Sequence, residues 1–291
     1  MNLTLGNLRK GFEDTGYICD EEVVLTVFLA LKLEKPILIE GPPGVGKTEM
    51  GKVLADVFET ELIRLQCYEG LDENKSLYEW NCQKQLLKIQ IDKGTGNTGQ
   101  LETDLFSPEY LLERPLLKAI QADRKVVLLI DEVDKSDDEF EAFLFEVLSD
   151  FQVSVPELGT IRARHIPMVI LTSNSERELS DGLKRRCVYL YLDFPGIERE
   201  IEIIRARVPE AGERLTAEIA RAVSYIRQNP EIRKKPSISE TLDWTRTLVS
   251  LNRDRLESSD VELTLNFLLK SRADQRVFRE KIGSDSLVKR G

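Results

Sequence analysis

The segment Gly41-Pro42-Pro43-Gly44-Val45-Gly46-Lys47-Thr48 follows the pattern G-x-x-x-x-G-K-[ST], with Glu49 next in the chain. Glycines at these positions let consecutive backbone N–H groups turn inward and cradle phosphate oxygens, and a helix starting at the end of the loop adds the positive end of its dipole. In this pattern Lys47 would reach the β- and γ-phosphates of a nucleotide, and the Thr48 hydroxyl would bind Mg²⁺. The segment therefore predicts a nucleotide site.

A second motif is the apolar run Leu128-Leu129-Ile130 that ends in two acids, Asp131 and Glu132. Ligands of open α/β sheets bind at the carboxyl ends of the strands, where these acids would lie. We expect Asp131 to hold Mg²⁺ through water and Glu132 to orient and polarise the water that attacks the γ-phosphate. The second acid favours hydrolysis over group transfer without activation of water.

A third strand end carries Thr172-Ser173-Asn174. Asn174 is the candidate for contact with the attacking water, although an asparagine in an ordinary turn would look the same. On the strand next to the catalytic one, Gln66 is a candidate for holding Glu132 inactive until a substrate arrives.

Two adjacent arginines, Arg185 and Arg186, end a short helical segment just before a strand. Taken alone, such a pair is most often a solvated surface feature. Together with the earlier motifs, one of the two becomes a candidate arginine finger that projects toward the nucleotide of a neighbouring subunit.

The elements that must position these residues alternate between strand and helix. Helices are expected over residues 20–33, from the glycine-rich loop to about 58, over 77–91 and over 137–150. Strands are expected over the apolar or alternating runs 36–40, 61–67, 126–130, 168–171 and 188–192. This order predicts a parallel sheet with helices on both faces.

The connecting segments are less regular. Residues 92–103 are predicted to form an exposed loop, Ser107-Pro108 to open a helix, and residues 151–166 to form a hairpin. His165 lies in this hairpin beside Arg162 and Arg164, and a solvated hairpin is its most economical interpretation. Both tryptophans, Trp80 and Trp244, are expected on helices as packing residues.

The pattern changes after Pro195-Gly196, beyond which only helical periodicity is found. We predict an α/β nucleotide-binding domain over residues 1–195 and a smaller helical domain over 196–291. The charged stretch from about Ser271 is expected to be loosely held.

Composition excludes several classes of protein. The 291 residues carry a net charge of -10, which disfavours bulk attraction to nucleic acid or anionic membranes. No apolar run approaches the ~20 residues needed to span a bilayer, and no signal peptide is recognised. Four scattered cysteines and one histidine argue against a disulfide framework or a zinc site and fit a reducing cytoplasm.

Taken together, these motifs resemble those of AAA+ ATPases in their order and spacing. More narrowly, Arg64-Leu65-Gln66-Cys67-Tyr68-Glu69-Gly70-Leu71-Asp72, Leu77-Tyr78-Glu79-Trp80-Asn81 and Leu183-Lys184-Arg185-Arg186-Cys187 are similar to the MoxR branch associated with carbon monoxide dehydrogenase maturation. The resemblance covers about residues 12 to 270.

The resemblance implies an αβα core with a helical lid, a helix-2 insert at about residues 85–106 and a pre-sensor hairpin at about 152–167. It matches Lys47 and Thr48 to Walker A, Asp131 and Glu132 to Walker B, and Asn174 to sensor 1. Arg186 is the first choice for the arginine finger and Arg185 the second. The arginine of the second sensor is absent from Pro236-Ser237-Ile238-Ser239-Glu240. Either a nearby arginine such as Arg233 or Arg246 substitutes for it, or the coupling of the lid differs.

The resemblance also implies ATP and Mg²⁺ as cofactors and a cytoplasmic hexameric ring. A partner with a von Willebrand factor A domain and a metalloenzyme client would complete a chaperone that remodels or helps to metallate that client. Two other functions stay open at this stage. One is a nucleic-acid motor, kept open by Arg162 and Arg164, and the other is a nucleotide-dependent switch or scaffold.

Overall fold

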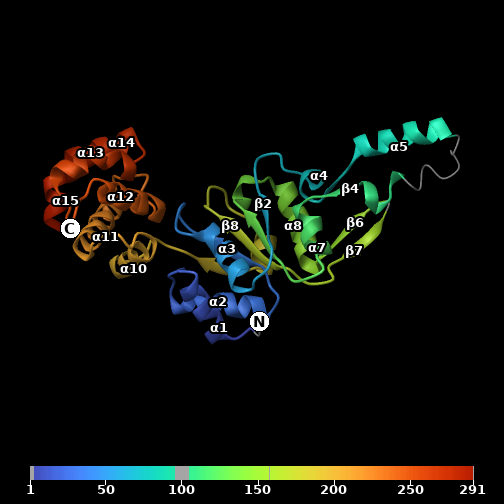
Figure 1. Ribbon diagram of the computed structural model, residues 1–291, viewed down its shortest axis with the longest axis horizontal. Coiled ribbons are helices and arrows are strands. Elements are labelled where there is room, and N and C mark those ends of the chain that lie inside the picture. Colours follow the sequence, from blue (N-terminus) through green and yellow to red (C-terminus); the bar gives the residue numbers. More distant parts are fainter. Residues whose placement is uncertain (1–2, 96–104, 157, 291) are drawn as a thin grey trace. The chain divides into compact units, whose positions relative to one another are not determined.

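The computed structural model describes residues 3–95, 105–156 and 158–290 (Figure 1). The chain forms two compact units. The sheet unit consists of Met1–Leu5, Leu25–Glu40 and Thr48–Tyr191, and the helical unit consists of Gly6–Val24, Gly41–Lys47 and Leu192–Gly291. The domain boundary at Pro195-Gly196 stays a prediction.

The sheet unit is built on five parallel strands in the order β2-β5-β8-β1-β9. Their bounds are β1 (Ile37–Glu40), β2 (Leu62–Gln66), β5 (Val127–Asp131), β8 (Met168–Ser173) and β9 (Val188–Tyr191). Every residue of β1, β5 and β8 is buried, as expected for strands covered on both faces. The expected parallel sheet is confirmed.

Because the strands are parallel, their carboxyl ends share one edge of the sheet. The register pairs Gln66 with Asp131 and Glu40 with Ser173 at this edge. Side chains that are far apart in the sequence therefore meet at the ends of β2, β5 and β8.

Helices pack on both faces of the sheet. On one face, Leu128 and Ile130 of β5 share a core with Phe140 and Leu144 of a helix. On the other face Gly51 allows a close approach, because a Cβ there would lie 3.2 Å from Cδ2 of Leu129. The helices described within residues 21–186, not all of which lie on the sheet, are α2 (Glu21–Lys32), α3 (Lys47–Val57), α4 (Glu73–Ser76), α5 (Cys82–Thr95), α7 (Pro115–Gln121), α8 (Asp138–Asp150) and α9 (Asp181–Arg186).

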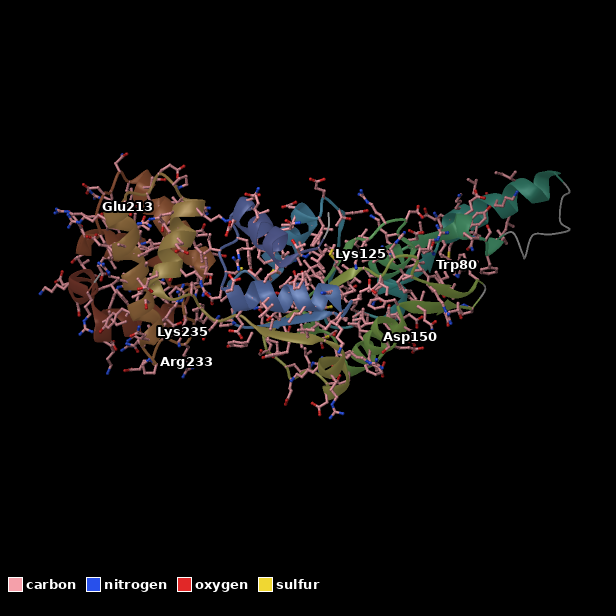
Figure 2. All side chains as sticks on the ribbon, turned by 90° about the horizontal axis from the view of Figure 1, so that it is seen from below. Trp80, Lys125, Asp150, Glu213, Arg233 and Lys235 are labelled. Atoms are coloured by element: carbon pink, nitrogen blue, oxygen red, sulfur yellow. The ribbon has the colours of Figure 1, made fainter. Side chains whose placement is uncertain are left out.

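Two antiparallel hairpins complete the sheet unit: β3 (Tyr78–Trp80) with β4 (Leu111–Glu113), and β6 (Gln152–Val155) with β7 (Gly159–Arg162). The second was expected. The first corrects the helix predicted from residue 77, since Trp80 lies on a strand and packs edge-on against Phe106 near the base of α5 (Figure 2). Two aromatic residues alternating at positions 78 and 80 suit a pleated strand better than a helix.

The connecting segments differ from expectation in length. The helix α5 continues to Thr95, beyond the expected start of the loop, and residues 96–104 lie outside the described part of the chain. Ser107-Pro108 opens only a 3₁₀ turn, η1 (Pro108–Tyr110), and a second such turn, η2 (Val133–Lys135), follows β5.

The helical unit contains a core centred on Trp244, which is fully buried and donates its indole N–H to Thr264 at 2.7 Å. This confirms the helical packing role expected of Trp244. The unit is made of α1 (Leu5–Asp14), α10 (Ile197–Arg207), α11 (Glu213–Gln228), α12 (Ile238–Ser250), α13 (Ser258–Leu268), α14 (Arg272–Val277), the π-helical η3 (Phe278–Ile282) and α15 (Ser284–Arg290). In the described residues of this unit every element is helical.

The stretch after Ser271 is not loosely held. Phe278 and Leu287 are fully buried in the core of the helical unit, and Ser284 donates to Glu262. The charges of this stretch lie between apolar residues at helical spacing, so one face packs while the other stays solvated.

Candidate functional site

The glycine-rich loop Gly41–Lys47 joins β1 to α3. Its glycines have positive φ angles of 152° at Gly41, 75° at Gly44 and 98° at Gly46, a region that residues with a Cβ rarely enter. A Cβ on Gly41 would also overlap the carbonyl oxygen of Leu192. The loop therefore depends on glycine for its shape, as a phosphate cradle does.

Lys47 is the first residue of α3 and is only 6% exposed. Its Nζ donates to the carbonyl oxygens of Gly41 and Pro42, each at 2.7 Å. These bonds hold the ammonium group against the loop, and its expected contact with nucleotide phosphates stays a prediction. Of the other candidates in this segment, Val45 is buried, and Glu49 is paired with Lys52 on α3 at 3.1 Å.

Asp131, at the end of β5, is 2% exposed and accepts bonds from three other elements. Its Oδ1 accepts from the hydroxyls of Thr48 at 2.9 Å and Thr172 at 2.5 Å. The structure thus brings together the two predicted magnesium ligands, Thr48 and Asp131, across 83 positions of sequence. Hydroxyl and carboxylate oxygens are hard donors of the kind that Mg²⁺ takes from proteins, so the residues present fit this ion.

Magnesium usually takes one or two protein carboxylates and completes its shell with phosphate oxygens and water. In keeping with that mode, the described residues contain no cluster of three or more His, Cys, Asp or Glu side chains that would hold a metal by itself.

Glu132 follows in a left-handed conformation with φ of 57°. Its Oε2 accepts from Gln66 Nε2 at 2.8 Å and from Lys135 Nζ at 2.7 Å, and its N–H donates to Thr172 Oγ1 at 2.9 Å. The hydrogen bond that Lys135 donates to Glu132 raises the pKa of Lys135. The expected contact between Gln66 and Glu132 is thus present.

Asn174 lies just beyond β8, and its backbone N–H donates to Asp134 Oδ2 at 3.0 Å. The same oxygen accepts from the N–H of Glu176 at 3.0 Å, and Ser175 between them has φ of 59°. Asp134 therefore shapes the loop that carries Asn174.

Both candidate finger arginines lie exposed near the end of α9. Arg186 places its guanidinium over the ring of Phe145 at 5.0 Å, whereas Arg185 is 83% exposed and approaches Asp181 at 4.0 Å. Arg186 thus packs against α8, and the choice between the two as arginine finger stays a prediction.

The structure does not single out a second sensor. Arg246 pairs with Asp243 at 3.2 Å, and Arg233 lies close to Lys235 in the segment before α12 (Figure 2). Ser237, the N-cap of α12, packs so closely on Gly44 that a Cβ on this glycine would overlap it. Gly44 and Ser237 both belong to the helical unit, so this contact lies within that unit.

Several polar residues of the site were not singled out by sequence reasoning: Arg64, Asp134, Lys135 and Arg177. Arg64 bonds Asp131, and Arg177 ties Ser136 O to the buried Glu141. The alternation of β2, which places Arg64 on the face of Gln66, was the available signal.

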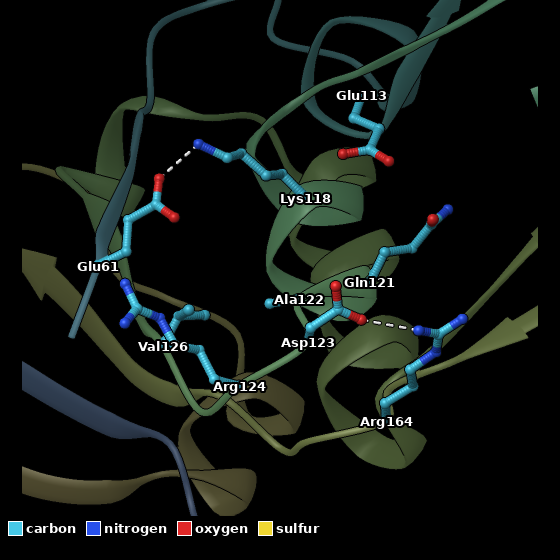
Figure 3. A pocket seen from close by; sticks show the side chains of 9 residues that line it. All are labelled: Glu61, Glu113, Lys118, Gln121, Ala122, Asp123, Arg124, Val126 and Arg164. Atoms are coloured by element: carbon cyan, nitrogen blue, oxygen red, sulfur yellow. Dashed lines mark hydrogen bonds and ion pairs between the residues drawn. The ribbon is translucent and has the colours of Figure 1, made fainter. Parts of the chain in front are cut away.

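A separate open cavity of about 550 Å³ lies at the opposite edge of the sheet (Figure 3). Glu61 and Val126, which precede β2 and β5, line it. Two of its cations are paired, Lys118 with Glu61 at 2.5 Å and Arg164 with Asp123 at 2.7 Å. It is distinct from the predicted nucleotide site.

A comparison with protein families matches residues 36–187, more than half of the chain, to the AAA domain (dynein-related subfamily). Point mutants of RuvB from Thermotoga maritima have a similar structure. One has a TM-score of 0.51 at 17% identity, covering 96% of this chain and 77% of that chain. A second has a TM-score of 0.51 at 19% identity, covering 93% of this chain and 72% of that chain. This likeness shows the fold alone.

Curated relatives match at low identity. Chaperone protein ClpB 2 of Parasynechococcus marenigrum is 31% identical over 140 residues, 47% of this chain and 13% of that protein. Gas vesicle ATPase GvpN of Haloferax mediterranei is 25% identical over 213 residues, which cover 69% of this chain and 59% of that protein. An uncharacterized protein of Staphylococcus aureus (strain USA300) is 25% identical over 229 residues, which cover 75% of this chain and 77% of that protein. The chain spans less than two thirds of ClpB 2 and of GvpN.

Proposed function

Because the chain belongs to the AAA domain family, dynein-related subfamily, we propose that it is a Mg²⁺-dependent ATPase that remodels a client protein as a ring-shaped homo-oligomer. The observation that supports this most directly is the hydrogen bond between Thr48 and Asp131. It joins the end of the phosphate-loop motif to the acidic strand end, with the catalytic candidate Glu132 next in the chain.

In the proposed reaction the loop N–H groups and Lys47 bind the phosphates of ATP. Thr48 and Asp131 would hold the magnesium ion, which supplies charge neutralisation to the β- and γ-phosphates when bound. Glu132 orients the attacking water and polarises it through a carboxylate oxygen. Asn174, placed by Asp134, makes a further contact to that water.

We further propose that Arg186 completes the site of a neighbouring subunit. Its exposed guanidinium can reach another chain, and in related phosphoryl-transfer enzymes an arginine supplied in trans stabilises the charge of the transition state. A hexamer is the proposed assembly.

For the client we propose a metalloenzyme that requires remodelling or metal insertion, with a von Willebrand factor A-domain protein as the adaptor. The support is the resemblance to the MoxR branch, together with a chaperone and a gas vesicle ATPase among the relatives. In the described part of the chain, no helix is long and apolar enough to cross a membrane. The four free cysteines support a reducing cytoplasm as the location.

A nucleic-acid motor receives less support. Arg162 donates to Gln152 at 3.0 Å and Arg164 is paired with Asp123, so both hairpin arginines already have partners in their own chain. Hydrolysis stimulated by DNA would favour that function over the proposed one, and absence of turnover would favour a nucleotide switch.

The test is ATP hydrolysis measured together with oligomeric state for wild type, Glu132→Gln and Arg186→Ala. Glu132→Gln should bind ATP, accumulate as rings and hydrolyse little. Arg186→Ala should lose turnover and regain part of it when mixed with Lys47→Ala subunits, because each supplies what the other lacks. Arg185→Ala is the matched control and should keep most of its turnover. Unchanged hydrolysis in Arg186→Ala, with a monomer in the presence of ATP, would overturn the ring mechanism.

A further inference from the structure

Arg64 lies in the middle of β2, a strand with a clear alternation of faces. Ile63 and Leu65 are buried in the core, while Arg64 and Gln66 share the other face. Arg64 lies on this face two residues before the strand ends, and its side chain extends toward the carboxyl edge of the sheet. There it meets the acid at the end of β5.

The guanidinium of Arg64 makes a two-point contact with Asp131. Nε and Nη2 donate to Asp131 Oδ2 at 3.1 and 2.5 Å, while the threonine hydroxyls bond Oδ1. Arg64 is thus the cation paired with a carboxylate that is almost fully buried. Its own side chain is 51% exposed and has room to move into solvent.

The same guanidinium is connected to the second acid. Nη2 also donates to Gln66 Oε1 at 2.6 Å, and Gln66 Nε2 donates to Glu132 Oε2 at 2.8 Å. The bond from Arg64 fixes which end of the amide faces Glu132. If Arg64 leaves, the Gln66 oxygen loses its donor and the amide is free to rotate away from Glu132.

Two cations beside one carboxylate repel each other and compete for it. We propose, resting on the ATPase function above, that Arg64 is a positioning residue that competes with Mg²⁺ for Asp131. When Mg²⁺ and nucleotide bind, Arg64 withdraws from Asp131 and Gln66 releases Glu132. Arg64 would thereby link occupation of the metal site to release of the residue that polarises water.

Lys135 offers a matched control, because it holds the same Glu132 oxygen at 2.7 Å but comes from η2, after the acids. Asp131 accepts the hydrogen bonds of Arg64, Thr48 and Thr172, and Lys135 is not among its donors. Removing Lys135 should alter the hold on Glu132 without altering the competition at Asp131.

The test measures binding of a fluorescent ATP analogue as Mg²⁺ is titrated, in wild type, Arg64→Ala, Arg64→Lys and Lys135→Ala. In Arg64→Ala the Mg²⁺ concentration for half-maximal enhancement of binding should fall about tenfold, while binding without Mg²⁺ stays the same. Arg64→Lys keeps the charge without the two-point contact and should fall between wild type and Arg64→Ala. Lys135→Ala should match wild type.

The outcomes separate the two proposals. If wild type does not bind the analogue, the proposed ATPase function fails. If wild type binds it in a Mg²⁺-dependent way and Arg64→Ala and Arg64→Lys both show the wild-type Mg²⁺ requirement, the competition is wrong although the ATPase is right. Should Arg64→Ala not fold, Arg64→Lys alone decides, and a wild-type Mg²⁺ requirement in it overturns the proposal.

Discussion

Asp134 holds Asn174 by its backbone, since Asp134 Oδ2 accepts the Asn174 N–H at 3.0 Å. The carboxylate is 4% exposed, and its Oδ1 is buried without a hydrogen-bond partner among the described residues. A buried carboxylate with one unsatisfied oxygen is costly, and its other oxygen fixes the loop by accepting the N–H groups of Asn174 and Glu176. The position of Asn174, just after β8, is therefore set by Asp134, which follows a different strand, β5, three residues after Asp131.

Replacing Asp134 tests this dependence. Asp134→Ala should lower kcat about 10- to 100-fold with a smaller effect on KM, because the loop bearing Asn174 is displaced while the phosphate loop is untouched. It should also lower the free energy of unfolding by about 2–3 kcal/mol. Steady-state hydrolysis and urea unfolding measure the two effects. Asp134→Asn retains an acceptor and should lose less of each, and wild-type kcat in Asp134→Ala would contradict the argument.

The buried pair of Arg227 and Glu200 should dominate the stability of the helical unit. Its two hydrogen bonds measure 2.6 and 2.8 Å, and Arg227 Nε also donates to the Pro236 carbonyl at 2.8 Å. Arg227→Ala leaves the fully buried Glu200 without its cation and should cost about 3–5 kcal/mol in chemical unfolding.

The exposed pair of Arg276 and Glu280 is the matched control for that variant. Arg276→Ala should change stability by less than about 0.5 kcal/mol, because an i,i+4 pair in water contributes little. Equal effects of the two substitutions would show that burial does not govern the Arg227 pair.

Substitution of Gly41 should damage the phosphate loop. Gly41→Ala combines a φ of 152° with overlap against Leu192, so we expect at least tenfold weaker binding of ATP and a loss of about 1–3 kcal/mol in stability. Calorimetric titration and thermal melting measure these changes. Gly6→Ala, in α1 with open space around it, should be neutral or slightly stabilising. Normal ATP binding by Gly41→Ala would refute the strain argument.

The cysteines should differ sharply in reactivity. Burial raises the pKa of the Cys67 thiol to about 12, and the charges of Asp131, Asp134 and Glu132 act in the same direction, whereas Cys82 is exposed. A thiol reagent at pH 8 should therefore label Cys82 rapidly and Cys67 only after unfolding. Mass spectrometry of labelled peptides, with Cys82→Ser as the control, reads this out, and fast labelling of Cys67 in the folded protein would disagree with the structure.

The same pKa has a consequence for stability in alkali. The unfolded thiol ionises near its ordinary pKa of 9.0, and the folded one near 12. The unfolded chain thus gains charge first, so stability is complete below about pH 9 and falls as pH rises toward 12. Cys67→Ala should flatten the alkaline limb of a stability-against-pH curve measured by urea unfolding. If the alkaline limb of Cys67→Ala had the same slope as that of wild type, groups other than Cys67 would cause the loss of stability.

Local sequence patterns were informative wherever the residues of one short segment determine the structure of that segment. The glycines of the phosphate loop and the apolar run before Asp131 could both be recognised in the chain. The strand at Trp80 was missed because three residues are too few for a period to be read. The packed end of the chain was missed because charge masked a buried face around Phe278.

By itself, the sequence determined the parallel sheet, the phosphate loop and the two acids at a strand end, because each follows from the residues of one segment. Only the tertiary structure decided which side chains share these acids. Arg64 meets Asp131 and Gln66 meets Glu132 because the parallel register sets β2 beside β5, and Asp134 meets Asn174 because β8 lies on the other side of β5. Register and strand order are long-range properties that residue spacing does not encode, and the hydrogen bonds of the site depend on both.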